Sequence, residues 1–162
     1  MSPDLSTTYL GLRLSSPLVA AASPLTGKLE MLRRLEDAGA GAVVLPSLFE
    51  EQIEHEETDL HALLEYGTDS FGEALTYFPA LQGLVTIPEA YLRHLEAAKR
   101  LLSIPVIASL NGVSPGGWIR YAQLCEEAGA DALELNVYAV ETDLDASAAS
   151  VEERTLQLVR RV

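Results

Sequence analysis

The chain has 162 residues, of which 48% are apolar and a single one, Cys125, is cysteine, and its formal net charge is −13. This length and apolar content predict one domain over residues 1–162 with a real hydrophobic core. The acidic balance argues against a nucleic acid or an anionic membrane as partner, and one cysteine excludes an internal disulfide framework. No apolar run approaches the ~18 residues of a membrane span and no signal pattern opens the chain, so we expect a cytoplasmic protein.

The first half of the chain predicts two buried strands with an amphipathic helix between them. Residues 18–22 and 42–45 are short apolar runs, which are typical of strands in parallel sheets. Leucines recur at helical spacing from Lys28 to Ala38, and Gly39 ends that helix. The acidic residues 50–65 predict a surface helix. The apolar stretch 77–87 predicts a loop packed over one end of the fold or, alternatively, a subunit contact.

The second half repeats this alternation. A helix is expected from Pro88 through residue 102, a strand over residues 105–110, and a helix that begins with Ser114 as N-cap and ends near residue 128. A strand over residues 132–136 follows. Ser150 and Glu153 then match a capping box and predict the start of a last helix.

Two blocks of sequence occur twice in the same order. Residues 14–20 are echoed 88 positions later by residues 102–108, and residues 36–45 are echoed 90 positions later by residues 126–135. The Ala-Gly-Ala turn alone could recur in any two βα units. Two matched blocks at nearly equal offsets favour a repeated βαβ module.

Four βα units predict an α/β fold with a parallel sheet, of the TIM-barrel type. A complete (β/α)8 barrel typically has ~200–250 residues, so four units amount to a (βα)4 half barrel. A doubly wound sheet is the alternative, but residues 22–27 lack its Gly-rich turn. A half barrel leaves sheet edges and an apolar face open, so we expect a homodimer that closes an eight-stranded barrel, or else an open, swapped or larger assembly.

Four segments in this order resemble the N-terminal half of dihydroorotate dehydrogenases and their dihydroorotate dehydrogenase-like relatives. They are residues 16–24, 38–44, 105–112 and 128–136. The resemblance implies an FMN-dependent barrel that oxidises dihydroorotate to orotate. It places Ala22 and Ser23 against the flavin at the end of the first strand, Ser47 after the second, Ser109 in the third and Asn136 in the fourth. Read without the resemblance, Ser23 starts a turn and Asn136 caps a strand end.

The chain departs from the family pattern at three places. Pro46 stands where the family has a lysine, and Ala139 stands where the family has its catalytic Cys or Ser. Alanine cannot accept a proton, so the chain has no base for dihydroorotate oxidation at that position. The family holds the FMN phosphate on the loops after strands seven and eight, which lie beyond the four units seen here. Residues 111–117 could offer backbone N–H groups to an anion, although an ordinary Ser-Pro helix cap explains them better.

No other residue group points to chemistry. His55 and His61 are six residues apart and fall on different faces of a helix, so we expect no metal site. Cys125 is expected to be a small core residue rather than a nucleophile.

Three functions remain open from the sequence. The first is an FMN-dependent oxidoreductase that is active when a full barrel assembles. The second, which we favour for the chemistry, is a self-associating relative, truncated or engineered, that lacks full catalytic machinery and serves as a non-catalytic scaffold. The third is association with a separate polypeptide that carries the remaining strands.

Overall fold

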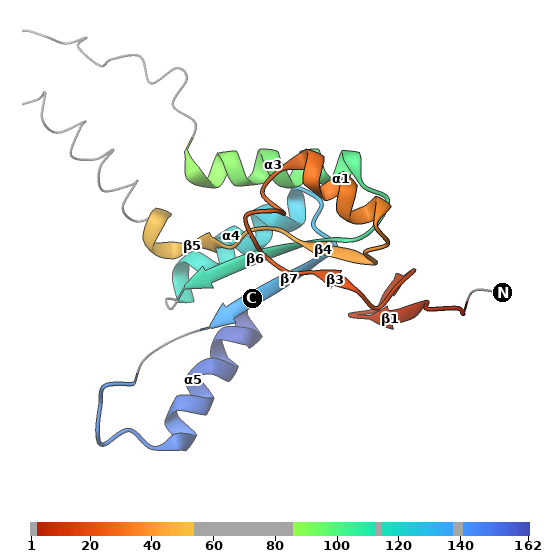
Figure 1. Ribbon diagram of the computed structural model, residues 1–162. Coiled ribbons are helices and arrows are strands. Elements are labelled where there is room, and N and C mark those ends of the chain that lie inside the picture. The colour runs from red at the N-terminus through yellow and green to blue at the C-terminus, as the bar shows by residue number, and fades with distance from the viewer. Residues whose placement is uncertain (1–2, 54–85, 113–114, 138–140) are drawn as a thin grey trace, which may run out of the picture.

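The computed structural model describes residues 3–53, 86–112, 115–137 and 141–162, without the side chains of 115–118. In this part of the chain the fold is mixed α/β with a parallel sheet (Figure 1). The strands of the sheet are β3 (Val19–Ala20), β4 (Ala42–Val44), β5 (Leu48–Phe49), β6 (Val106–Gly112) and β7 (Ala132–Val137). The helices are α1 (Leu29–Asp37), α3 (Ile87–Leu101), α4 (Pro115–Glu127) and α5 (Ala148–Arg161).

The sheet runs in chain order. β3 pairs with β4, β4 with β6 and β6 with β7, and all of these pairs are parallel. β5 continues the line of β4 on the same side of β6, because β4 pairs with the first half of β6 and β5 with the second half. A doubly wound sheet would show a reversal of strand order, and the described strands show none. The arrangement is compatible with a partial α/β barrel.

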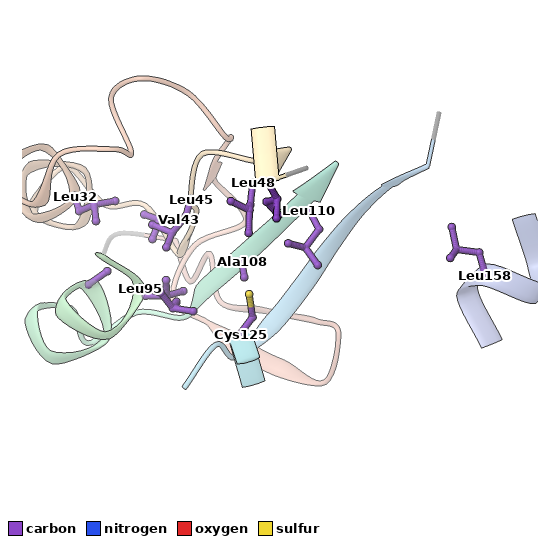
Figure 2. Close-up of a cluster of buried hydrophobic side chains, with 12 residues drawn as sticks. Leu32, Val43, Leu45, Leu48, Leu95, Ala108, Leu110, Cys125 and Leu158 are labelled. Carbon is purple, nitrogen blue, oxygen red and sulfur yellow. The ribbon is translucent and has the colours of Figure 1, made fainter. Parts of the chain in front are cut away.

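One face of the sheet packs against helices. Figure 2 shows its buried side chains gathered between sheet and helices, with Leu158 of α5 set to one side. Leu32 of α1, Leu95 of α3 and Cys125 of α4 meet alternate residues of the strands in this layer. The strand residues that contribute are Val43, Leu45, Leu48, Val106, Ala108 and Leu110. Successive side chains of a strand point to opposite faces of the sheet. The strand residues between those of this layer therefore point to the face away from the helices.

The opposite face divides into an apolar and a polar half. Near the amino ends of the strands, Ala42, Val44 and Ile107 pack with Leu14, which is 1% exposed. Leu14 belongs to an antiparallel hairpin of β1 (Thr7–Tyr9) and β2 (Leu12–Leu14) that the sequence analysis did not predict. The polar half lies toward the carboxyl ends of β6 and β7.

The repeated module is real in three dimensions. Gly39 and Gly129 follow α1 and α4 with φ of 96° and 93°, a backbone region that suits glycine. In each module the next residue donates back into the helix, from Ala40 N–H to the Leu35 carbonyl at 3.1 Å and from Ala130 N–H to the Cys125 carbonyl at 3.0 Å. The second repeat therefore reproduces the helix end of the first.

Among the described residues the predicted strands and helices are present, with different ends in three places. The strand expected over residues 18–22 is Val19–Ala20, and α3 begins at Ile87 after the N-cap Thr86 rather than at Pro88. Ser114, the expected N-cap of α4, lies outside the described residues.

The third difference is at the start of the last helix. Its N-cap is Ser147, whose Oγ accepts the N–H of Ser150 at 3.2 Å. The capping box assigned to Ser150 and Glu153 is therefore wrong, because an earlier serine captures the free N–H group and Ser150 lies inside the first turn. Of the acidic stretch 50–65, residues 50–53 are helical and the rest lies outside the described residues, as do residues 77–85. None of the helices described is long and apolar enough to cross a membrane.

A close backbone contact makes Gly41 the tightest point of the first module. Its N–H donates to the Leu18 carbonyl at 2.7 Å, and a Cβ added there would lie 2.0 Å from the carbonyl oxygen of Ser16. The equivalent position of the second module is Asp131, whose N–H donates to the Val106 carbonyl at 2.9 Å. The two modules thus share the hydrogen bond, but only the first has no room for a side chain.

We predict that Gly41→Ala lowers the free energy of unfolding by more than about 3 kcal/mol, because the methyl group would overlap backbone that cannot move aside. Urea unfolding followed by circular dichroism measures this. Gly39→Ala is the matched control: nothing lies within 4 Å of its added Cβ, so it should lose only the ~1–2 kcal/mol of a left-handed alanine. Equal losses for the two variants would contradict the packing argument.

Candidate functional site

A cluster of polar side chains lies at the carboxyl ends of the strands, on the face opposite α1, α3 and α4. Ser109 of β6 is directly opposite Glu134 of β7 in the sheet register, and Asn111 is opposite Asn136. Ser47 lies between β4 and β5 on the other side of β6. Parallel pairing with a common direction is what brings these distant residues to one edge of the sheet.

Ser109 is the centre of the cluster. Its hydroxyl lies 2.8 Å from Ser47 Oγ, donates to Glu134 Oε1 at 2.8 Å and accepts from Asn136 Nδ2 at 3.2 Å. Asn136 Nδ2 also donates to Glu134 Oε1 at 3.2 Å. Ser109 is 0% exposed, and one hydroxyl proton and two lone pairs are all that a serine side chain can offer. Its hydrogen-bonding capacity is therefore used within the protein.

Tyr91 of α3 supports Ser109 from the helix side. The N–H of Ser109 donates to the Tyr91 hydroxyl at 2.9 Å, and the hydroxyl lies 3.4 Å from the Ser109 carbonyl oxygen that accepts from it. The carbonyls of residues 105 and 107 accept from Val43 and Leu45 of the neighbouring strand line. The backbone of Ser109 points to the same side, where residues 45–47 are not in a strand. The phenol therefore takes the place of a missing strand partner.

The environment of Tyr91 changes its ionisation. Burial, chiefly, raises the pKa of the Tyr91 phenol well above its usual value, with Cys125 and Glu134 adding to the rise and the Ser109 backbone opposing it. Burial likewise raises the pKa of the Cys125 thiol to about 11. Cys125 is 2% exposed and part of the core cluster, so the expectation of a structural cysteine is confirmed.

A pocket of about 670 Å³ opens beside the cluster. Its walls are Ala21 and Ala22 after β3, Ser47, Asn111 of β6, and residues 134–137 of β7. Three residues expected to hold a cofactor, Ala22, Ser47 and Asn136, therefore line one pocket. A second hollow, lined by residues of α1 and α3 that include Arg33, Arg34 and Arg100, lies on the outer helices and shares no residue with the cluster.

The remaining predicted residues lie elsewhere. Ser23 forms a turn in which its N–H donates to Thr26 Oγ1 at 3.2 Å and its carbonyl accepts from Thr26, and it does not line the pocket. His94 of α3 binds the Thr26 carbonyl at 3.0 Å and so ties this turn to α3. Ser109 lies behind the pocket wall. Their direct roles toward a flavin stay predictions, and Ala139 lies outside the described residues.

Sequence reasoning missed Glu134, Asn111 and Tyr91. Asn111 alternates with buried residues of β6, and Glu134 alternates with the partly buried Leu133 and Leu135 of β7. The period-two pattern of these strands could therefore have shown on which face the two side chains lie. Nothing in the sequence connects Tyr91 with Ser109. Among the residues that the structure describes, no group of three His, Cys, Asp or Glu could hold a metal ion, and His55 and His61 lie outside them.

The comparisons with known proteins agree with the geometry. A protein of Aeropyrum pernix described as "Putative dihydroorotate dehydrogenase A (fumarate)" is 31% identical over 138 residues, which are 83% of this chain and 41% of that protein. The NAD-dependent dihydropyrimidine dehydrogenase subunit PreA of Escherichia coli (strain K12) is 28% identical over 141 residues, 84% of this chain and 32% of PreA. The resemblance to the dihydroorotate dehydrogenase-like family is confirmed.

This relationship concerns a part of the known proteins. The chain spans 41% and 32% of the length of these two relatives, which fits an N-terminal fragment of a dihydroorotate dehydrogenase-like protein. No protein-family model matches the chain. The relatives are dehydrogenases by their names, and the predicted kinship to oxidoreductases is confirmed at that level.

We predict that Tyr91→Phe lowers the free energy of unfolding by about 1–3 kcal/mol, because the N–H of Ser109 loses the hydroxyl that accepts from it. Urea unfolding at pH 7 measures the loss. Tyr9→Phe is the control, since Tyr9 is 53% exposed on the hairpin and its hydroxyl should contribute little. A loss below about 0.5 kcal/mol in Tyr91→Phe would show that the phenol does not replace a strand partner.

Proposed function

We propose that this chain forms the (βα)4 half of a TIM-type barrel in a dihydroorotate dehydrogenase-like flavin oxidoreductase, and that the pocket is part of its active site. One observation carries the proposal: Ser47, Glu134 and Asn136, joined through Ser109, meet at the carboxyl ends of neighbouring parallel strands and border one pocket. Active sites of such barrels are built at this end of the strands.

The described residues fit the ring of a flavin but not its phosphate. Ala21 and Ala22 carry only methyl groups where they border the pocket, so they leave room for an apolar ring beside them. No Lys or Arg is among the residues that line the pocket. A flavin would supply hydride transfer. The phosphate would be held by groups outside the described pocket.

The residues of this chain would orient ligands rather than carry out a complete reaction. Asn136 and Ser47 are fixed by Ser109, so they present polar atoms to the pocket in a rigid arrangement. Pro46 provides no cation, and Ala139 provides no base. We therefore propose that this half lacks full catalytic machinery by itself. An FMN-dependent activity of the assembled barrel is the alternative.

Flavin binding distinguishes these two functions. If the chain holds only the ring, riboflavin and FMN bind with affinities within about threefold of each other, as measured by quenching of flavin fluorescence. Ala22→Leu should abolish binding by filling the room for the ring, whereas Ala90→Leu, on the exposed side of α3, should not. FMN binding more than tenfold tighter than riboflavin would instead show an assembled phosphate site. Absence of binding by both would refute the flavin proposal.

We further propose that the chain associates with a second copy, as a homodimer that closes a barrel. Among the described strands, β3 and β7 each pair on one side only, so two sheet edges are open. α5 extends away from the sheet beyond β7 (Figure 1) and buries Leu158, but Leu156 and Val159 are 48% and 54% exposed. A further βα unit beside β7 would cover this apolar side of α5.

The predicted dimer has twice the 17.5 kDa mass of the chain. Size-exclusion chromatography with light scattering measures the mass. Leu156→Glu should shift the protein toward the monomer, because it places a charge in the contact. Leu144→Glu is the control, since Leu144 is fully exposed in the segment before α5. A monomeric wild-type protein at tens of micromolar would overturn the dimer.

A further inference from the structure

The polar wall of the pocket offers acceptors to a ligand. Ser109 donates its one hydroxyl proton to the Glu134 carboxylate. In its contact with Ser47 it must therefore accept a hydrogen bond, and Ser47 must donate one. The Ser47 oxygen is then left with its lone pairs. Asn136 Nδ2 has two protons, and these go to Ser109 Oγ and Glu134 Oε1. The hydroxyl protons of Ser47 and Ser109 and the amide protons of Asn136 are thus used inside the cluster.

Asn111 adds an acceptor that none of the described residues satisfies. Its Oδ1 is buried and has no hydrogen-bond partner in the part of the chain that the structure describes. Asn111 lines the pocket and lies opposite Asn136 in the sheet. A buried acceptor without a donor costs about 1–3 kcal/mol, a cost that a bound donor would remove.

The charge at this site is uncompensated. Glu134 forms none of the ion pairs found among the described residues, and none of the described residues that line the pocket is Lys, Arg or His. The chain as a whole carries a net charge of −13. A partly buried carboxylate gains most from a cation that it can both pair with and accept hydrogen bonds from.

We propose that the pocket binds a ligand through a positively charged nitrogen group with at least two N–H donors, an amidinium, guanidinium or primary ammonium group. Such a group would donate to Glu134, to the Ser47 oxygen and to Asn111 Oδ1, and it would neutralise the carboxylate. A carboxylate ligand would instead meet the like charge of Glu134. The proposal rests on the pocket being the ligand site of the function proposed above, and it names the chemistry of the ligand.

Three ring compounds of equal size test this by isothermal titration of the full chain. Benzamidinium should bind at least ten times more tightly than benzamide, which keeps the N–H donors without the charge, and benzoate should bind most weakly. Glu134→Gln should lower the benzamidinium affinity at least tenfold and change the benzamide affinity less than threefold. Glu96→Gln makes the same change of net charge at an exposed pair with Arg100 and should alter neither affinity.

The outcomes separate this proposal from the flavin proposal. Benzoate binding as tightly as benzamidinium, or equal benzamidinium affinities in wild type and Glu134→Gln, would overturn the cation site. The comparison of the three compounds on the wild type decides the question even if Glu134→Gln fails to fold. Cation selectivity without flavin binding would support this site and refute the flavin function. Flavin binding without cation selectivity would do the reverse.

Discussion

Ser109 connects the core of this protein with its candidate site. Its backbone fills a gap in the sheet through Tyr91, and its side chain fixes Ser47, Glu134 and Asn136. The gap exists because residues 45–47, between β4 and β5, are not in a strand beside this part of β6. A phenol from α3 therefore completes the sheet at the point where the polar side chains begin, so the stability of the sheet and the geometry of the site depend on the same residue.

On the face of the sheet opposite α1, α3 and α4, β6 and β7 each carry an apolar packing residue followed by a polar residue of the cluster. On β6, Ile107 lies in the apolar layer covered by the hairpin and Ser109 lies in the polar cluster. On β7, Ala132 packs against the apolar layer and Glu134 belongs to the cluster. The step of two residues keeps both on one face. The amino ends of these strands thus pack in an apolar layer, and their carboxyl ends carry the polar side chains that border the pocket.

The sequence predicted the βα units because their signals are local. Leucine spacing in α1 and the glycines after α1 and α4 depend only on near neighbours, and the structure confirms them. The family resemblance implied that Ala22, Ser47 and Asn136 lie at one site, and in the structure the three line one pocket. The hairpin of β1 and β2 was missed because its strands have three residues each, too few for a period to show. β5 was missed for the same reason.

The sequence by itself determined the number and order of the βα units and the family they resemble, because helix periods, buried apolar runs and turn glycines are properties of short segments. The tertiary structure alone decided which side chains are joined by hydrogen bonds. That Ser109 is satisfied inside the protein, that Tyr91 completes the sheet and that Asn111 Oδ1 lacks a donor all depend on contacts between residues far apart in the chain. Hydrogen bonds have strict distance and direction requirements, and only the packed arrangement of β6, β7 and α3 sets those.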